Sequence, residues 1–144
     1  MAKTNVSSLD VEDHDGSTAG LYLAGTLVTP SAAELNSTLD FEYQLLEAAG
    51  AITIKNGVCK IAKTSAGALA ATLANPTTVT DDYKRLVIIN FQAQLNTVTL
   101  TGGFGNGGAG EDVCTFGAAI GDNLSLMAFG GFWYIIGNTG GTIT

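Results

Sequence analysis

Short stretches in which apolar and polar residues alternate fill most of the chain after residue 50. This period of two is typical of a β-strand with one buried face. Residues 97–101 alternate strictly and place Val98 and Leu100 on one side, while residues 85–91 have the continuous apolar run of a central strand. The other predicted strands are residues 51–55, 58–62, 69–73, 113–116, 124–129 and 132–136, with an edge strand at 142–144.

Two pairs of small residues predict tight turns between these strands. Asn56-Gly57 separates residues 51–55 from 58–62, and Asn-Gly is the strongest two-residue hairpin signal. Gly130-Gly131 separates the last two long strands in the same way. Several short strands at intervals of eight to twelve residues are typical of a sandwich or barrel. The sequence therefore predicts a mainly β fold, a small antiparallel β-sandwich or barrel, over residues 51–144.

A different pattern occupies residues 21–50. Residues 21–28 alternate loosely and predict a first strand. Ser31 and Glu34 then form a capping box directly after Pro30, which marks a helix start. One helical face follows at spacings of four, four and three, with Gly50 as a possible stop: Leu35, Leu39, Tyr43 and Leu46. Poor helix formers follow Asn36, so the firm prediction is one short helix at about residues 31–40.

Residues 1–20 are polar and carry few groups able to build a core. Val6, Leu9 and Val11 are the sizeable apolar side chains among them. A segment of this composition cannot bury enough apolar surface to fold alone. We therefore expect an extended N-terminal arm that becomes ordered only on a partner.

Charge is scarce in this chain and unevenly distributed. Charged residues make up 13% of the sequence, and between residues 86 and 144 they are only Glu111, Asp112 and Asp122. Soluble monomers normally carry mixed charge over their whole surface. The C-terminal half is therefore expected either to be covered by partner subunits or to present a neutral Thr/Asn/Gly surface. A charge-poor monomer is the alternative.

The composition also argues against several classes of protein. With a net charge of −7 and six Lys and Arg residues, the chain has no basic stripe for nucleic acid. It has neither an apolar run long enough for a membrane span nor a secretory signal at its start, so assembly in the cytoplasm is expected. Cys59 and Cys114 have no CxxC neighbour, and we predict buried free thiols rather than a disulfide.

Candidate chemical motifs are weak. Residues 103–108 match GxGxxG, but a β segment rather than a helix follows, so a flexible inter-strand loop is expected and no cofactor. His14 is the single histidine, which rules out a His-based triad or a two-His zinc site within one subunit. The acidic run around it does not fit a calcium loop, because with Gly16 in sixth place Val11 and Tyr22 occupy the first and twelfth. We predict no catalytic residue and no metal site.

The densest aromatic group lies at the second hairpin: Phe129, Phe132, Trp133 and Tyr134. Such a group can stack on sugars or bases. It can equally pack across strands inside a core, and this second interpretation is favoured because cross-strand aromatic pairs commonly stabilise sheets.

Two stretches resemble bacteriophage structural proteins. Residues 28–36, VTPSAAELN, resemble the "VTxxAAELN" segment of phage head-decoration, head-fibre and tail-fibre proteins. Residues 69–144 are similar to the β domain of small phage virion proteins, in which a glycine-rich loop is followed by "G-D-x-L-x-L", a glycine turn and "W-Y". The matching residues are Ala70, Leu73, Pro76, Arg85-Leu86, Asn96-Thr97-Val98-Thr99, Gly121-Asp122, Leu124, Leu126, Trp133-Tyr134 and Gly141-Thr142.

This resemblance implies a homotrimer without enzymatic activity. The expected function is that of a decoration (cement) protein on the outer surface of a phage head. Its partner would be the major capsid protein, contacted by Val6, Leu9 and Val11 of the arm. The alternative is a trimeric fibre or spike fragment that binds a host receptor or glycan through residues 102–110 or the aromatic hairpin. A small glycan-active enzyme is a third class, for which no acid/base pair can be named.

Overall fold

The computed structural model describes residues 22–23, 26–27, 41–63 and 65–144. The chain divides into two units, Met1–Asp40 and Phe41–Thr144. In the first unit, β1 (Tyr22–Leu23) and β2 (Thr26–Leu27) pair antiparallel, so two short strands replace the single strand predicted over residues 21–28. The predicted arm, residues 1–20, and the predicted helix at about residues 31–40 lie outside the described residues.

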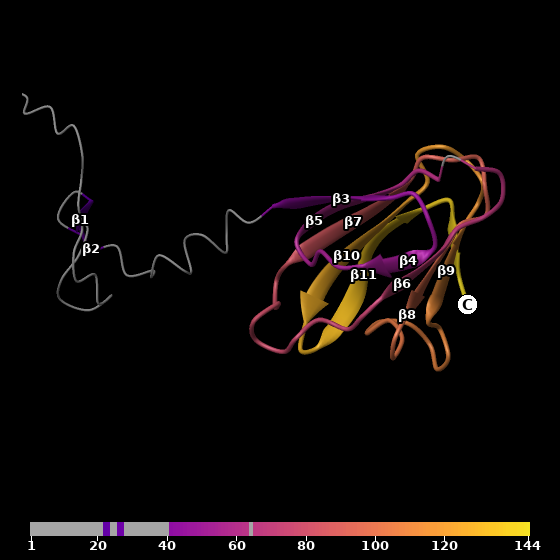
Figure 1. The fold of residues 1–144 in the computed structure, drawn as a ribbon. Helices are drawn as coiled ribbons and strands as arrows, with labels where there is room; N and C mark the ends of the chain where they lie inside the picture. Colours follow the sequence, from indigo (N-terminus) through magenta and orange to yellow (C-terminus); the bar gives the residue numbers. More distant parts are fainter. Residues whose placement is uncertain (1–21, 24–25, 28–40, 64) are drawn as a thin grey trace, which may run out of the picture. The chain divides into compact units, whose positions relative to one another are not determined.

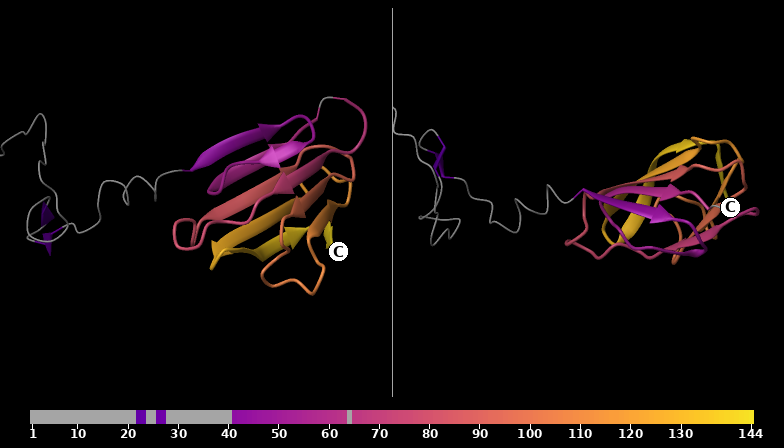
Figure 2. Two further views of the ribbon diagram at one scale, coloured as in Figure 1. Left: turned by 60° about the horizontal axis from the view of Figure 1, so that its bottom comes forward. Right: turned by 45° about the horizontal axis from the view of Figure 1, so that its top comes forward.

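The second unit consists of two five-stranded sheets packed as layers (Figures 1 and 2). The first sheet has the order β11-β10-β7-β5-β3, and the second has the order β12-β9-β8-β6-β4. The strands are β3 (Glu42–Leu46), β4 (Gly50–Ile52), β5 (Gly57–Ile61), β6 (Ala70–Leu73), β7 (Arg85–Asn90), β8 (Thr97–Leu100), β9 (Val113–Phe116), β10 (Asn123–Phe129), β11 (Phe132–Thr139) and β12 (Gly141–Ile143). The predicted mainly β, sandwich-like fold is confirmed.

The chain builds both sheets at once. From β3 to β8, successive strands alternate between the two sheets. As a result β3, β5 and β7 are parallel neighbours in the first sheet, and β4, β6 and β8 are parallel neighbours in the second. Parallel strands cannot be joined by a tight turn, and here each connection runs through the opposite sheet. The sheets are therefore mixed rather than wholly antiparallel.

Antiparallel strands extend the first sheet beyond β7 and the second sheet beyond β8. β10 pairs with β7 and β11 with β10, while β9 pairs with β8 and β12 with β9. The hairpin predicted around Gly130-Gly131 and the edge strand predicted near the end of the chain are confirmed as β10–β11 and β12. At the opposite end of each strand order, β3 and β4 form the edges of the two sheets (Figure 1).

The hairpin predicted at Asn56-Gly57 is wrong, because β4 and β5 lie in different sheets. The dipeptide instead lies in the connection that crosses from β4 in the second sheet to β5 in the first. The carbonyl of Asn56 accepts a 2.8 Å hydrogen bond from the N–H of Glu42, and its side-chain Oδ1 accepts one of 3.3 Å from the N–H of Arg85. Gly57 has φ +140°, and a Cβ there would overlap the backbone of Glu42. Glycine thus allows β3 to pair closely with β5.

The helical face predicted to continue through Tyr43 and Leu46 is also wrong. Both residues lie in β3, where Leu46 is buried and Tyr43 is exposed. A spacing of three places two residues on one side of a helix but on opposite sides of a strand. The ladder with β5 decides in favour of the strand. The β unit therefore includes residues 41–50, which sequence analysis had assigned to the preceding segment.

One core fills the space between the sheets. Trp133 is fully buried, and its Nε1 donates a 3.0 Å hydrogen bond to the carbonyl of Ala74. Val98 and Leu100 share the buried side of β8, as their alternation predicted. Other large, fully buried side chains come from both sheets: Ile61, Leu73, Leu86, Ile88, Phe116, Leu124 and Leu126.

Two buried asparagines hold the corner where the chain passes from β7 to β8. Asn96 donates through Nδ2 to Oδ1 of Asn90 at 2.8 Å, and its own Oδ1 accepts the N–H of Leu69 at 2.6 Å. Asn90 donates in turn to the carbonyls of Gln94 and Ala119, both at 3.3 Å. Both asparagines are fully buried, so these bonds replace the water that their amides give up.

Candidate interaction surfaces

The outer face of the first sheet is largely apolar. Cross-strand pairing aligns Tyr43, Val58 and Val87 in one row, and Leu45, Lys60 and Ile89 in the next. These positions alternate with the buried ones along β3, β5 and β7. We call this outward surface of β3, β5, β7 and β10 the first-sheet face. Its charged side chains are Lys60 and Arg85.

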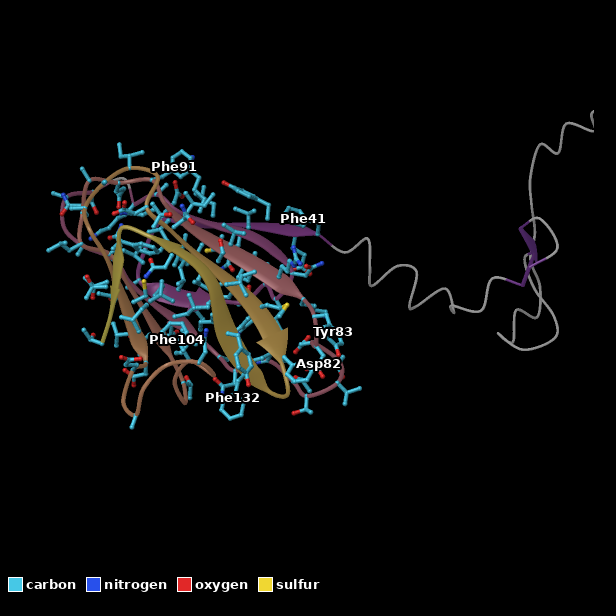
Figure 3. All side chains as sticks on the ribbon, turned by 180° about the vertical axis from the view of Figure 1, so that it is seen from behind. Phe41, Asp82, Tyr83, Phe91, Phe104 and Phe132 are labelled. Carbon is cyan, nitrogen blue, oxygen red and sulfur yellow. The ribbon has the colours of Figure 1, made fainter. Side chains whose placement is uncertain are left out.

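Aromatic residues mark the two ends of β3 on this face. Phe41, directly before the strand, is 68% exposed and Tyr43 is 63% exposed. Phe91 follows β7 and lies under Lys60, whose Nζ is 4.1 Å from the ring centroid. In Figure 3, Phe41 and Phe91 lie along the same margin of the domain. Exposed apolar patches of this kind often mark interaction sites.

The outer face of the second sheet has a different chemistry. Its outward positions are mostly threonine and alanine, and no outward residue of its strands is charged. Two rows cross the sheet in register: Ala51–Thr72–Thr99–Val113 and Ala70–Thr97–Thr115–Thr142. This is the neutral surface that the scarcity of charge predicted for the C-terminal half.

The aromatic group of the second hairpin is divided between core and surface. Trp133 is buried, as the favoured interpretation expected, but Phe129, Phe132 and Tyr134 are not. The Phe129 ring centroid lies 5.7 Å from that of Tyr83 and 6.4 Å from that of Tyr134. We call Tyr83, Phe129, Phe132 and Tyr134 the aromatic cluster. Asp82 lies beside it and accepts the N–H of Gly130 at 2.8 Å (Figure 3).

The glycine-rich connection, residues 102–110, joins β8 to β9, as predicted for an inter-strand loop, and it is hydrogen-bonded to the sandwich. Phe104 is buried in the core. Asn106 clamps β11 by donating to the carbonyl of Ile135 at 3.0 Å and accepting the N–H of Ile135 at 2.9 Å. Gly105 donates to the carbonyl of Trp133 at 2.8 Å. The connection therefore covers the outer edge of β11, and β9 rather than a helix follows it.

A buried carboxylate holds the connection before β7. Asp81 accepts Nζ of Lys55 at 2.6 Å, Nζ of Lys84 at 3.0 Å and the N–H of Thr77 at 2.7 Å. Burial acts to raise the pKa of Asp81, but these hydrogen bonds outweigh it and hold the pKa well below its usual range. The cluster is satisfied internally, so its role is structural.

We expect Asp81→Asn to lower the free energy of unfolding by about 1–3 kcal/mol at pH 7. Because the pKa of Asp81 is lower in the folded than in the unfolded chain, its stabilisation is complete above about pH 5 and declines as pH falls below about 4. The variant should therefore lose less stability than the wild type between pH 5 and pH 3. Urea unfolding across this range tests the effect, with the exposed Glu47→Gln as control. Equal pH dependence of wild type and D81N would contradict it.

Both cysteines are free and buried, as predicted. Burial raises the pKa of Cys59 to about 11. Burial and the nearby carboxylate of Asp122 raise the pKa of Cys114 to about 11. Thiols with a raised pKa are poor nucleophiles and metal ligands, so they belong to the core.

The predicted capsid contacts Val6, Leu9 and Val11 lie outside the described residues, as does His14. Within the part of the chain that the structure describes, no group of three His, Cys, Asp or Glu side chains is placed to hold a metal ion. The same part contains no helix with the length and apolar content needed to cross a bilayer. The surfaces above are therefore the candidate functional features of the β unit.

Comparisons with known proteins leave the family open. No protein-family model matches the sequence, and no curated protein does. One solved structure with partial similarity to this chain is described as "Structure of a chaperone-substrate complex". The similarity covers 68% of this chain and 17% of that chain, at 16% identity and a TM-score of 0.40. At this level it supports no conclusion about function.

The first-sheet face could not be recognised from the sequence, because Tyr43 and Leu46 fit a helical spacing and no strand was predicted over residues 42–46. Tyr43 and Leu45 were part of, or next to, a predicted helical stripe. The apolar run at residues 86–89 predicts a strand that is covered on both sides. In the structure Val87 and Ile89 are half-buried on the outer face of β7, which fits a strand whose outer face is covered by another molecule.

Proposed function

We propose that this chain is a structural virion protein, a trimeric decoration protein that binds the outer surface of a bacteriophage capsid and stabilises it. The observation that carries the proposal is the chemistry of the two outer faces. Across the outward positions of both sheets, Lys60 and Arg85 are the charged side chains, and the rest are apolar or small and neutral. Such faces suit a subunit that is covered within an assembly.

Two further points support this proposal. The segment at residues 28–36 and the pattern over residues 69–144 resemble those of phage virion proteins. Among the described residues, buried titratable groups such as Asp81 and the two thiols have structural roles. Both points favour an assembly subunit over an enzyme.

In the proposed mechanism, residues 1–20 contact the major capsid protein through Val6, Leu9 and Val11. A segment that becomes ordered on binding loses conformational entropy at that moment, but it can bridge neighbouring capsid subunits. Three arms joined by one trimer bind with avidity, because the first to dock raises the effective concentration of the others.

Deletion of residues 1–20 tests this mechanism. We expect the truncated chain to remain folded and trimeric, because the β unit begins at Phe41, and to lose binding to capsids assembled without the protein. Co-sedimentation with such capsids measures binding, and circular dichroism with light scattering measures fold and mass. A full-length control with Val6, Leu9 and Val11 all replaced by serine should lose binding likewise. Undiminished binding by the truncated chain, or failure to fold, would count against the proposal.

The aromatic cluster favours a second candidate, a trimeric fibre or spike fragment that binds a host receptor or glycan. Tyr83 is 71% exposed, and Phe129 and Phe132 are each more than two-fifths exposed beside the carboxylate of Asp82. Exposed rings next to a polar group can stack on a sugar while a side chain accepts its hydroxyl protons. This protein would bind host cells without any capsid, and Tyr83→Ser with Phe129→Ser would abolish that binding. A decoration protein would show neither effect.

A further inference from the structure

The first-sheet face carries a large exposed apolar patch. A fully exposed aromatic side chain presents about 150–250 Å², so Phe41, Tyr43 and Phe91 together expose on the order of 350 Å². The largest apolar patch on a typical monomer is about 300–600 Å² in all. The remaining exposed and half-buried apolar side chains of the face add to this: Leu45, Val58, Val87, Ile89 and Met127. The whole lies near the upper end of that range and is a substantial part of the roughly 800 Å² that each partner buries in a standard interface.

Among the described residues, no strand pairs with the outer edge of β3. In a parallel ladder, alternate residues of an edge strand bond to the neighbouring strand. The N–H of Glu42 donates to Asn56 and the carbonyl of Leu46 accepts from Ala62, so the even-numbered residues of β3 face β5. The backbone groups of Tyr43 and Leu45 therefore point to the free edge. An open edge with exposed apolar side chains is a liability in a monomer and is normally covered.

The charges around the face are complementary. Lys60 and Arg85 lie on β5 and β7, and neither forms an ion pair among the described residues. Glu42 and Glu47 lie at the two ends of β3, exposed and likewise without an ion pair in that part of the chain. A carboxylate thus lies at each end of the edge strand, with Glu42 on the side of β3 that also holds buried Leu46, and the two cations lie on the outer face. In a ring of identical subunits each contact joins two different patches, so one copy's β3 margin can meet the next copy's β5–β7 region.

We propose that the first-sheet face is the surface through which copies of this chain associate, with β3 of one copy packed against β5 and β7 of the next. This inference rests on the proposed trimeric function and names the subunit contact. We assign a second copy as the occupant because one chain supplies both halves of the contact. These halves are the apolar edge strand β3, with a carboxylate at each end, and the apolar rows of β5 and β7, which carry the two cations. The threonine face of the second sheet has no charge and little large apolar surface, and it stays outside this contact.

A pair of lysine substitutions on β3 tests the assignment. Tyr43 and Leu45 are exposed, so Tyr43→Lys with Leu45→Lys leaves the core intact and places two charges in the contact. The matched control is Ala70→Lys with Thr72→Lys, which changes two exposed, alternate positions of β6 on the other face. Light scattering over a range of concentrations should show three copies for the wild type and the control. The β3 variant should associate at least about tenfold more weakly.

A β3 variant that keeps the wild-type mass while folded would overturn the inference. If the lysine pair prevents folding, Tyr43→Ser with Leu45→Ser provides the same comparison without charge. Capsid co-sedimentation of the same samples separates the two proposals. A wild-type trimer that binds capsids, together with a trimeric β3 variant, contradicts only the contact assigned here. A wild-type trimer that does not bind capsids, together with a monomeric β3 variant, contradicts only the decoration function.

Discussion

Trp133→Ala is expected to lower the free energy of unfolding by about 3–5 kcal/mol, the usual cost of removing a large buried aromatic side chain. The indole is fully buried between the sheets and makes one polar contact, from Nε1 to the carbonyl of Ala74 at 3.0 Å. Its removal leaves a cavity that two hydrogen-bonded sheets can close only in part. Urea unfolding of the variant measures the loss.

Two further variants separate the causes of this loss. Trp133→Phe keeps most of the apolar volume but leaves the Ala74 carbonyl without its donor, so we expect about 1–3 kcal/mol. Phe132→Ala changes the adjacent residue, which points outward, and should cost little. Equal destabilisation by W133A and F132A would show that the hairpin, rather than the core, determines the effect.

Asn96→Ala is the second large expected effect, about 3 kcal/mol, because it removes both buried hydrogen bonds of the amide and leaves one buried N–H unpaired at about 1–3 kcal/mol. The N–H of Leu69 loses its acceptor, while Oδ1 of Asn90 loses the 2.8 Å bond from Asn96 and keeps one of 3.3 Å from the N–H of Gln92. Gln94→Ala, in the same connection but with no core bond from its side chain, is the matched control. Asn90→Ala and the double variant complete a cycle, and we expect the double variant to cost clearly less than the sum of the single ones. Additive losses would contradict a shared network.

Strand positions could be predicted from the sequence because burial on one side of a sheet imposes a period of two. The alternation around Val98 and the run over residues 85–91 correspond to β8 and β7. Alternation does not identify the neighbouring strand. Asn56-Gly57 fits a tight turn, yet it lies in the connection between the two sheets, where Gly57 packs against the backbone of Glu42. That constraint involves residues fifteen positions apart and leaves no local signal.

The candidate surfaces were less predictable. Scarcity of charge indicated neutral faces, and the threonine rows of the second sheet agree with this. The apolar character of the first-sheet face depends on Tyr43 and Leu45, whose side chains point outward only because Glu42–Leu46 is a strand. Spacing alone could not distinguish that strand from a helix. The aromatic hairpin shows the same limit, because Trp133 is buried and Phe132 is exposed although they are adjacent.

The alternation of β3 to β8 between the two sheets also bears on how the chain reaches its fold. Each parallel partner lies well away in sequence, as Gly57 with Leu86 and Ala70 with Thr97 illustrate. Contacts of this kind require loop closure before they contribute stability, and proteins dominated by them fold slowly. The β10–β11 hairpin is local, and it brings Trp133 into the core. The β unit therefore completes its folding only when strands far apart in the sequence have paired, and until then its apolar strands are exposed to association with other chains.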